Sequence, residues 1–171
     1  MKHKASHSYA SPIRAFCFFC LISFSIGATA QERQPLYNPT ADAAQDLAEA
    51  LLLARQQHKH VLVQVGGNWC PWCYRLHDFI LSDPKVDSLV KADYILVRIN
   101  YSPENRNYPI LARLGYPQRF GFPVLLVLDQ EGVRLHTQDT ALLEQGESYD
   151  EEKLLSFLRH WNVEALDPAA Y

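Results

Sequence analysis

Two cysteines three residues apart, Cys70 and Cys73, lie where an apolar strand gives way to a helix. The stretch HVLVQVG, which starts at His60, is rich in β-branched and apolar residues and is typical of a buried strand. The segment GGNWCPWCYRLHDFI follows it over residues 66–80, and Pro71 suits the first turn of a helix. This pattern constrains the chain most, because it predicts a strand–loop–helix unit with both sulfur atoms at the start of the helix.

The first thirty residues are predicted to be a signal peptide and not part of the folded domain. They hold three basic and no acidic residues, then the apolar run AFCFFCLISFSIGA and the small residues ATA that end at Ala30. This order is typical of a secretory signal peptide. The run is shorter than the ~20 residues that a membrane-spanning helix needs. We expect cleavage after Ala30 and a periplasmic or secreted protein with no stable membrane span, the alternative being an uncleaved membrane anchor.

A second pair with the same spacing, Cys17 and Cys20, lies inside the apolar run and is expected to leave with the signal peptide. The remaining chain keeps 13 basic and 19 acidic residues, so its net charge is about −6. This mild acidity argues against nucleic acid or an anionic membrane surface as a partner. Because thiols outside the cytosol tend to be oxidised, the one remaining pair is suited to act as a redox couple.

The rest of the chain is predicted to be a short leader, residues 31–39, followed by one α/β domain, residues 40–171. Thr40 is a candidate N-cap for the first helix. Alternating helices and buried strands imply an α/β sandwich, and the DQEG turn adds an antiparallel edge hairpin. Helices are predicted over residues 40–57, 71–81, 103–115 and 150–161, a short helix or turn over 82–92, and strands over 60–66, 94–101, 123–129 and 133–137.

The position of each cysteine predicts its role in disulfide exchange, where the thiolate is the reactive form. Cys70 lies at the start of the helix, where unpaired backbone N–H groups and the helix dipole favour negative charge. Such positions lower a cysteine pKa from about 8.5 to ~3.5–7.5, and two pKa units correspond to about 2.7 kcal/mol. Cys73 lies one turn further in and should be more buried. We therefore predict Cys70 as the attacking thiolate and Cys73 as the resolving thiol.

The neighbours of the pair are expected to support it. Pro71 shapes the turn, and Trp72 carries no charge that would acidify Cys70, so only a moderate fall in its pKa is expected. Trp69 either packs beside the pair and offers an apolar surface to substrates, or is an ordinary core residue. Metal binding is the main rival: His77 could join the two cysteines, but a closed zinc site needs a fourth ligand. We predict no metal.

These residues resemble the thioredoxin superfamily, and most of all exported bacterial thioredoxin-like proteins. The likeness rests on VLVQVGGNWCPWC as strand, turn and active-site helix, and on GFPVLLVLDQEG some fifty residues later. It implies a thioredoxin-like fold, with a central mixed β-sheet flanked by helices on both faces. It also implies a cis peptide bond between Phe122 and Pro123 that faces the cysteines. Beside it, Gly121 and Phe122 would pair with an extended substrate segment by strand addition.

The sequence departs from the family at one position of the strand before the motif. Thioredoxins usually carry a buried aspartate there, which handles the proton of the resolving cysteine, whereas this chain has Gln64, which cannot titrate. Arg98 matches the basic residue that usually lies near it. Proton transfer would then depend on water or another group. We expect slower resolution through Cys73, or a narrower range of partners.

The resemblance implies an exported thiol–disulfide oxidoreductase that acts on protein thiols and disulfides and exchanges electrons with an unidentified redox partner protein. Its only redox group would be the pair Cys70 and Cys73, without a further cofactor. The uncharged Trp72 favours the reducing direction without fixing it. The alternative is a non-catalytic thioredoxin-fold module that binds a peptide or partner and uses its disulfide only for structure.

Overall fold

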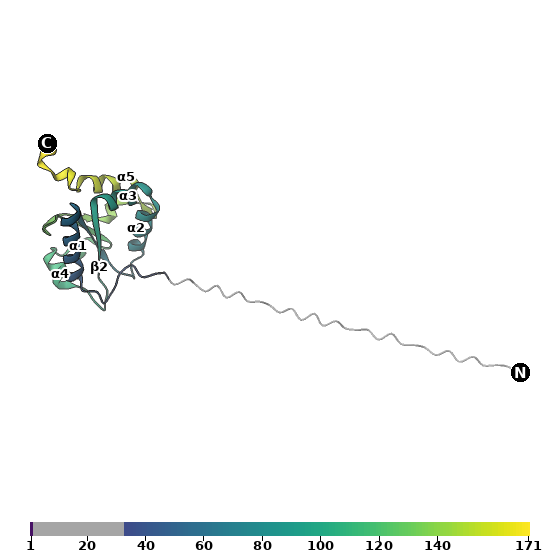
Figure 1. The fold of residues 1–171 in the computed structure, drawn as a ribbon. Coiled ribbons are helices and arrows are strands. Elements are labelled where there is room, and N and C mark those ends of the chain that lie inside the picture. Colours follow the sequence, from purple (N-terminus) through teal and green to yellow (C-terminus); the bar gives the residue numbers. More distant parts are fainter. Residues whose placement is uncertain (2–32) are drawn as a thin grey trace. The chain divides into compact units, whose positions relative to one another are not determined.

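The computed structural model describes residue 1 and residues 33–171 of the chain. Most of the predicted signal peptide, including Cys17, Cys20 and the cleavage site after Ala30, lies outside the described residues. Gln34–Tyr171 form one compact unit (Figure 1). Within residues 33–171, no helix has both the length and the apolar character needed to cross a membrane.

A four-stranded mixed β-sheet forms the centre of this unit. Its strands are β1 (His60–Gly66), β2 (Tyr94–Asn100), β3 (Val124–Leu128) and β4 (Arg134–Asp139), in the order β2-β1-β3-β4. β1 is parallel to β2, while β3 is antiparallel to both β1 and β4. Every residue of β1 is buried, as the apolar sequence of this strand predicts. The edge hairpin expected from DQEG is the β3–β4 pair.

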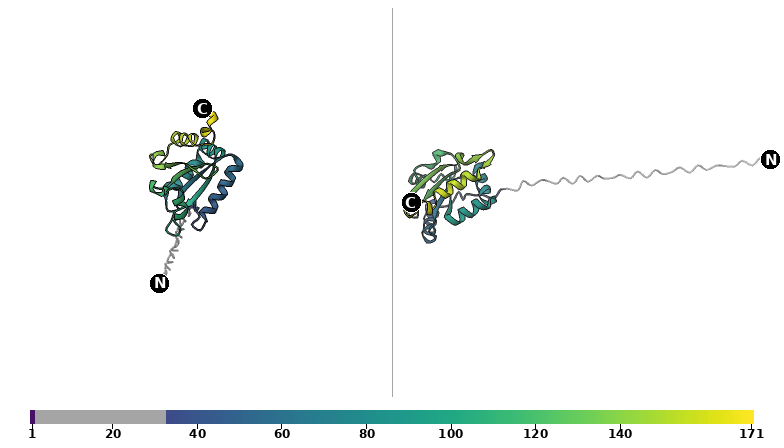
Figure 2. Two further views of the ribbon diagram at one scale, coloured as in Figure 1. Left: turned by 90° about the vertical axis from the view of Figure 1, so that its left-hand side faces the viewer. Right: turned by 90° about the horizontal axis from the view of Figure 1, so that it is seen from above.

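Helices cover both faces of the sheet (Figures 1 and 2). One face packs against α1 (Ala43–Gln57) and α4 (Tyr108–Arg113). The other packs against α2 (Pro71–Ser82), α3 (Pro84–Asp93) and α5 (Glu151–His160). The predicted architecture, a central mixed sheet with helices on both faces, is confirmed.

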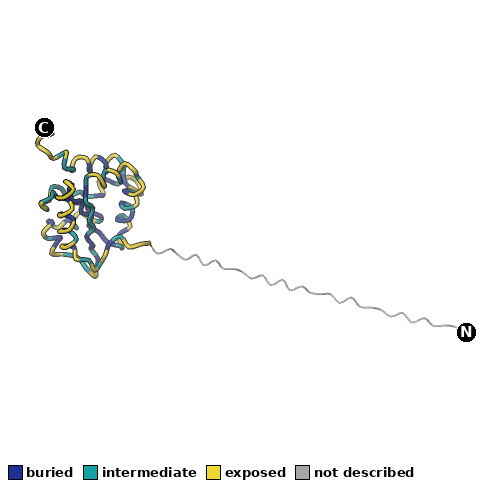
Figure 3. Tube along the Cα trace, viewed as in Figure 1, coloured by how far each residue is buried: buried dark blue, intermediate teal, exposed yellow. Residues whose placement is uncertain are grey.

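Two hydrophobic clusters, one on each face, hold the layers together. Successive side chains of a strand point to opposite faces, so Val61, Val63 and Val65 join the cluster under α1 and α4, whereas Leu62 joins the cluster under α2, α3 and α5. Gln64 follows the same alternation and lies on the α2 side. Buried positions line the sheet and the inner sides of the helices, and the exposed positions face outward (Figure 3).

The start of the first helix differs from the prediction. α1 begins at Ala43, and its N-cap is Asp42, whose carboxylate accepts two first-turn N–H groups at 2.9 and 3.1 Å. Thr40 instead donates from its backbone N–H and its hydroxyl to the side-chain oxygen of Asn38, at 3.0 and 2.8 Å. Asp42 is favoured as the cap because a negative charge also gains from the positive end of the helix dipole.

The helix predicted over residues 103–115 is much shorter in the structure. Only α4 (Tyr108–Arg113) is α-helical, and a 3-10 turn, η1 (Pro117–Phe120), follows it. The residues before α4 form a loop because the Asn100 side chain donates to the Ser102 hydroxyl at 3.0 Å and to the Asn105 carbonyl at 2.8 Å. These bonds give the backbone an alternative to the helix.

Several smaller elements complete the fold. α3 settles the choice between helix and turn for residues 82–92, and Asp83 caps it. A short hairpin after β4 was not expected from the sequence. The remaining elements are η2 (Thr140–Leu143), β5 (Glu144–Gln145), β6 (Ser148–Tyr149), η3 (Glu164–Leu166) and η4 (Pro168–Ala170).

Candidate active site

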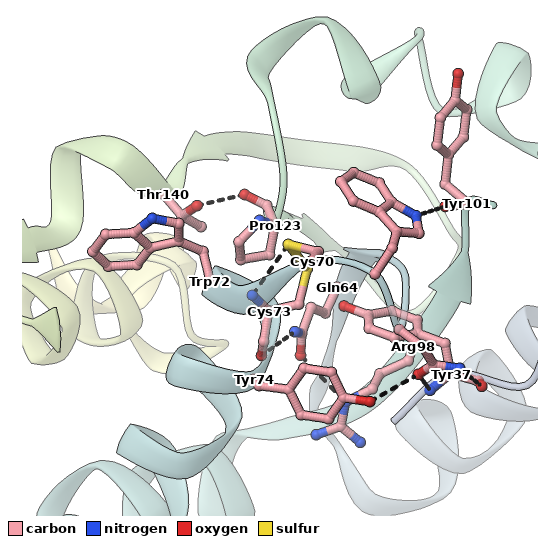
Figure 4. The surroundings of a disulfide bond; sticks show 12 residues. Tyr37, Gln64, Cys70, Trp72, Cys73, Tyr74, Arg98, Tyr101, Pro123 and Thr140 are labelled. Carbon is pink, nitrogen blue, oxygen red and sulfur yellow. Dashed lines mark hydrogen bonds between the residues drawn. A yellow bond between two sulfur atoms is a disulfide. The ribbon is translucent and has the colours of Figure 1, made fainter. Parts of the chain in front are cut away.

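The sheet topology brings three loops together at one edge. The parallel strands β1 and β2 end side by side, with Gly66 opposite Asn100. β3 runs the other way and begins at the same edge, with Val124 opposite Val65. The cysteine loop after β1, the loop after β2 and the loop that carries Pro123 before β3 therefore meet, as Figure 4 shows.

The two cysteines lie at the start of α2 and are joined in a disulfide, with their Cα atoms 5.3 Å apart. Cys70 is the N-cap residue, and its sulfur accepts the backbone N–H of Cys73 at 3.2 Å. A sulfur in this place meets the unpaired N–H groups and positive dipole of the helix. Cys70 is 3% exposed and Cys73 is 0% exposed, so the expectation that Cys73 is the more buried is confirmed.

The loop before β3 holds the cis peptide bond that the family resemblance implies, between Phe122 and Pro123. Pro123 is buried and faces the disulfide (Figure 4), and its carbonyl accepts the hydroxyl of Thr140. Gly121 is exposed and has a φ of +88°, a conformation that favours glycine. The backbone N–H and C=O of Phe122 make no hydrogen bond to another residue within 33–171.

Aromatic side chains flank the cysteines on the β2 side. Trp69 is 53% exposed, which rules out an ordinary core position. Its indole N–H donates to the Tyr101 carbonyl at 2.7 Å, and its ring meets Phe122 edge-on, with centroids 5.3 Å apart. Phe122 in turn stacks on Tyr101 at 4.9 Å. An open hollow of about 600 Å³ lies beside Trp69 and is also lined by Pro39, Asn68, residues 100–104 and Arg106.

On the other side of the pair, Trp72 is held against the body of the protein. It is half-buried, its ring meets Tyr149 edge-on at 5.6 Å, and its carbonyl accepts the Tyr149 hydroxyl at 3.4 Å. The Arg75 guanidinium lies over the Trp72 ring, 4.5 Å from its centroid. Pro71 is exposed at the first position of α2, as predicted.

Gln64 and Arg98, which occupy the positions that handle a proton in the resembled family, lie next to each other, and Gln64 contacts Cys73. Gln64 is 0% exposed; its amide group donates to the Cys73 carbonyl at 3.5 Å, and its oxygen accepts from Arg98 at 3.3 Å. Burial lowers the pKa of Arg98, but a guanidinium stays charged in proteins. Arg98 also contacts Nδ1 of His77 at 3.1 Å. Within the described residues, no group of three or more His, Cys, Asp or Glu side chains is placed to hold a metal ion.

Sequence reasoning missed two residues of this site, Tyr37 and Asn68. The Asn68 side chain accepts the backbone N–H groups of Leu36 and Tyr37, both at 2.9 Å, and donates to the Tyr37 carbonyl at 2.8 Å. The Tyr37 ring forms a separate buried cluster with Cys70 and Cys73. Part of the segment predicted to be a leader therefore belongs to the site. The only sequence signal for this part of the site is Tyr37, an aromatic residue between Pro35 and Pro39.

Gly66 was also missed, because the sequence suggests only that it ends the strand. A methyl group built on Gly66 would lie 2.6 Å from the Tyr37 hydroxyl oxygen and closer still to the sulfur of Cys73. Real side chains do not tolerate such contacts. The missing side chain is what allows the Tyr37 phenol and Cys73 to approach each other.

Comparison with known proteins agrees with this geometry. The model of the Thioredoxin-like family matches residues 42–130. A disulphide isomerase from Xylella fastidiosa Temecula1 has a similar structure, with a TM-score of 0.64, 25% identity, and coverage of 74% of this chain and 95% of that one. A thioredoxin from Thermus thermophilus has a TM-score of 0.51 and 24% identity, and covers 70% of this chain and 85% of its own.

One curated relative is also similar in sequence. The disulfide bond reductase DsbH of Chlamydia pneumoniae is 30% identical over 94 residues, which make up 52% of this chain and 57% of that protein. The chain thus spans little more than half the length of this relative.

Proposed function

This chain belongs to the thioredoxin-like family, and we propose on that basis that it is a thiol–disulfide oxidoreductase whose redox group is the Cys70–Cys73 pair. The observation that carries the proposal is the position of the Cys70 sulfur. It caps α2, accepts the Cys73 N–H, and lies beside the loop that holds the cis bond before Pro123. A sulfur atom so placed is stabilised as a thiolate and can attack a disulfide.

The reducing half of the proposed reaction starts from the dithiol. The Cys70 thiolate attacks one sulfur of a substrate disulfide, that bond breaks, and the departing substrate sulfur takes up a proton. The Cys73 thiolate then attacks the Cys70 sulfur, and the second substrate thiol leaves and is protonated. Two electrons pass from the cysteine pair to the substrate, and the pair ends as the disulfide seen here. No further cofactor is needed.

A purely structural disulfide is a weaker explanation of the same pair. The bond joins two residues one turn apart at the start of a single helix, so it ties no two elements together. By the loop-closure estimate, a ring of four residues adds about 2 kcal/mol of stability, against about 4.7 kcal/mol for a loop of 100 residues. The hydrophobic cluster under α2, α3 and α5 already holds α2 in place through Leu76 and Ile80.

The substrate we propose is an extended segment of a protein. The unpaired N–H and C=O of Phe122 can accept such a segment by strand addition, while exposed Gly121 leaves the approach open. Trp69 and the hollow beside it offer an apolar surface next to the cysteines. Main-chain recognition of this kind would allow more than one protein substrate.

We further propose export to the periplasm and action in the reducing direction, with electrons supplied by a separate redox protein. Export is supported by the signal-peptide pattern that ends at Ala30. The reducing direction is supported by the likeness to a protein named a disulfide bond reductase and by the uncharged Trp72. The likeness to a disulphide isomerase makes direction the first property to measure.

Reduction of insulin by the protein in the presence of a chemical reductant tests the proposal. The wild type should accelerate insulin reduction, and the Cys70→Ser variant should not. The reduction potential of the pair, measured by titration, should lie above about −300 mV, because a lower value is typical of an inert structural bridge. The Cys73→Ser variant should accumulate mixed disulfides with its substrates on Cys70. Equal activity of wild type and Cys70→Ser would refute the proposal.

A further inference from the structure

The hydroxyl group of Tyr37 has no role in the reaction described above. Tyr37 is 2% exposed, and within the described residues its hydroxyl makes no hydrogen bond. Buried polar groups are nearly always paired, and an unpaired one is costly to bury. An unpaired buried phenol beside the cysteine pair therefore calls for an explanation.

The hydroxyl is aimed at the resolving cysteine. The Tyr37 oxygen and the Cys73 sulfur both lie within 2.6 Å of the point that a side chain on Gly66 would occupy, so they are at most about 5 Å apart. Tyr37 packs in one buried cluster with both cysteines, and Figure 4 shows its ring reaching in beside them. Asn68 makes three hydrogen bonds to the backbone of Leu36 and Tyr37, which hold the phenol beside the cysteines.

The phenol is a hydrogen-bond donor at neutral pH and not a base. Burial raises the pKa of the Tyr37 hydroxyl well above its ordinary value, and the positive charge of Arg98 and the nearby Gln64 amide offset only part of this rise. The Gln64 side chain interacts with the Tyr37 hydroxyl, but the hydroxyl has no hydrogen-bond partner within the described residues. The other titratable or charged groups that face it are Tyr74 of α2, Tyr149 of β6 and the cysteine pair itself.

We propose that Tyr37 donates its O–H to the Cys73 thiolate when the pair is reduced. The proposal rests on the proposed function. In the disulfide, the Cys73 sulfur carries no charge and is a poor acceptor, which agrees with the unpaired hydroxyl seen here. In the dithiol, the thiolate becomes a strong acceptor, and hydrogen bonds to charged groups are about twice as strong as neutral ones. Arg98 adds a positive charge nearby.

This bond would act at the resolution step. Cys73 loses its proton to water, and the phenol holds the resulting thiolate in place. The thiolate attacks the Cys70 sulfur, the bond between Cys70 and the substrate sulfur breaks, and the electron pair leaves with that sulfur, which takes up a proton. The cysteine pair is oxidised by two electrons and the substrate is reduced by two. The phenol would thus stabilise the Cys73 thiolate in a protein whose Gln64 cannot titrate and so cannot accept the Cys73 proton.

The Tyr37→Phe variant tests the proposal, because it keeps the ring and removes only the hydroxyl. The reduced protein is mixed with a dithiobis-nitrobenzoate reagent, which releases one coloured thiol when Cys70 attacks and a second when Cys73 resolves the mixed disulfide. At about pH 7, the first release should match the wild type and the second should be about tenfold slower. The midpoint of its pH profile should rise by about one unit, which corresponds to 1.36 kcal/mol.

Tyr94→Phe is the matched control. It removes the hydroxyl of another buried tyrosine, which donates to the Leu158 carbonyl at 2.5 Å and lies at the opposite end of β2 from the site. Both release steps should stay as in the wild type. The oxidised Tyr37→Phe variant should unfold at a urea concentration no lower than the wild type, because the hydroxyl that it lacks has no partner in the disulfide state.

The possible outcomes separate this proposal from the proposed function. A second release that is unchanged in Tyr37→Phe overturns the proposed role of Tyr37. A second release that is slowed equally at every pH also overturns it, because a packing defect would produce that result. A lower urea midpoint for oxidised Tyr37→Phe also contradicts it, because the hydroxyl would then be paired in the disulfide state. If the wild type gave no first release, the proposed function of Cys70 would instead be refuted.

Discussion

Replacing Asn68 with alanine should free the segment that carries Tyr37 from the active-site loop. The Asn68 side chain makes three hydrogen bonds to the backbone of Leu36 and Tyr37, at 2.9, 2.9 and 2.8 Å. These bonds span more than thirty residues of sequence. They connect the cysteine loop to the chain before α1, and alanine can make none of them.

The expected loss follows from the number of these bonds. A neutral hydrogen bond contributes about 1 kcal/mol net, so opening of the segment should become easier by about 3 kcal/mol. Since 1.36 kcal/mol is a factor of ten, the open population should rise about a hundredfold. The hydrophobic clusters on the sheet are untouched, so the effect should be a local opening more than a loss of the whole fold.

Limited proteolysis by chymotrypsin measures this opening, because the enzyme cuts after Leu36 or Tyr37 only when the segment is released. When opening and closing are fast, the cutting rate follows the open population. Asn68→Ala should be cut about a hundred times faster than the wild type. The control Asn162→Ala also loses side-chain hydrogen bonds, to Asp93 and the backbone of η3, but should leave the rate unchanged. An increase of less than fivefold for Asn68→Ala would refute the reasoning.

Three other outcomes follow from the structure. Gly66→Ala should lower the free energy of unfolding in urea by about 1–3 kcal/mol, because the alanine methyl group would collide with the Tyr37 hydroxyl and the Cys73 sulfur. An unchanged midpoint of urea unfolding would contradict this prediction. Gln64→Asp should shorten the lifetime of a mixed disulfide severalfold by placing a titrating group beside Cys73, and an equal lifetime would show that no such group is needed. Burial raises the pKa of Tyr37 and Tyr94. Above about pH 10 the unfolded chain therefore binds fewer protons than the folded protein, and the folded protein loses stability. The Tm should fall above this pH, and a constant Tm up to about pH 11 would be inconsistent with the burial of the two tyrosines.

Local sequence patterns predicted an α/β sandwich and the cysteine centre, whereas the central mixed sheet with helices on both faces came from the family resemblance. The buried strand β1 is predicted residue for residue, because a run of β-branched and apolar residues ended by glycine has few alternatives. The place of Cys70 at the start of α2 follows from Pro71, which can occupy a first helical turn. The cis bond before Pro123 came only from the family resemblance, since local sequence does not determine it.

The parts that sequence did not reveal depend on contacts between distant residues. Asn68 looks like an ordinary loop residue until the segment around Tyr37 is placed against it. Gly66 ends a strand in the sequence, but its lack of a side chain matters only because two other atoms converge on it. The cap of α1 was misplaced for a local reason, because Asn38 holds Thr40 in a turn and leaves Asp42 to cap.

The pH dependence of alkylation of Cys70 tests the central claim most directly. In a Cys73→Ala variant that lacks the predicted signal peptide with Cys17 and Cys20, the backbone N–H that Cys70 accepts is kept, and the rate of reaction with iodoacetamide follows the Cys70 thiolate alone. We predict a midpoint well below the ordinary cysteine pKa of about 8.5, within the range of ~3.5–7.5 seen at helix N-termini. A midpoint at or above about 8.5 would contradict the account, because Cys70 would then be an unactivated thiol.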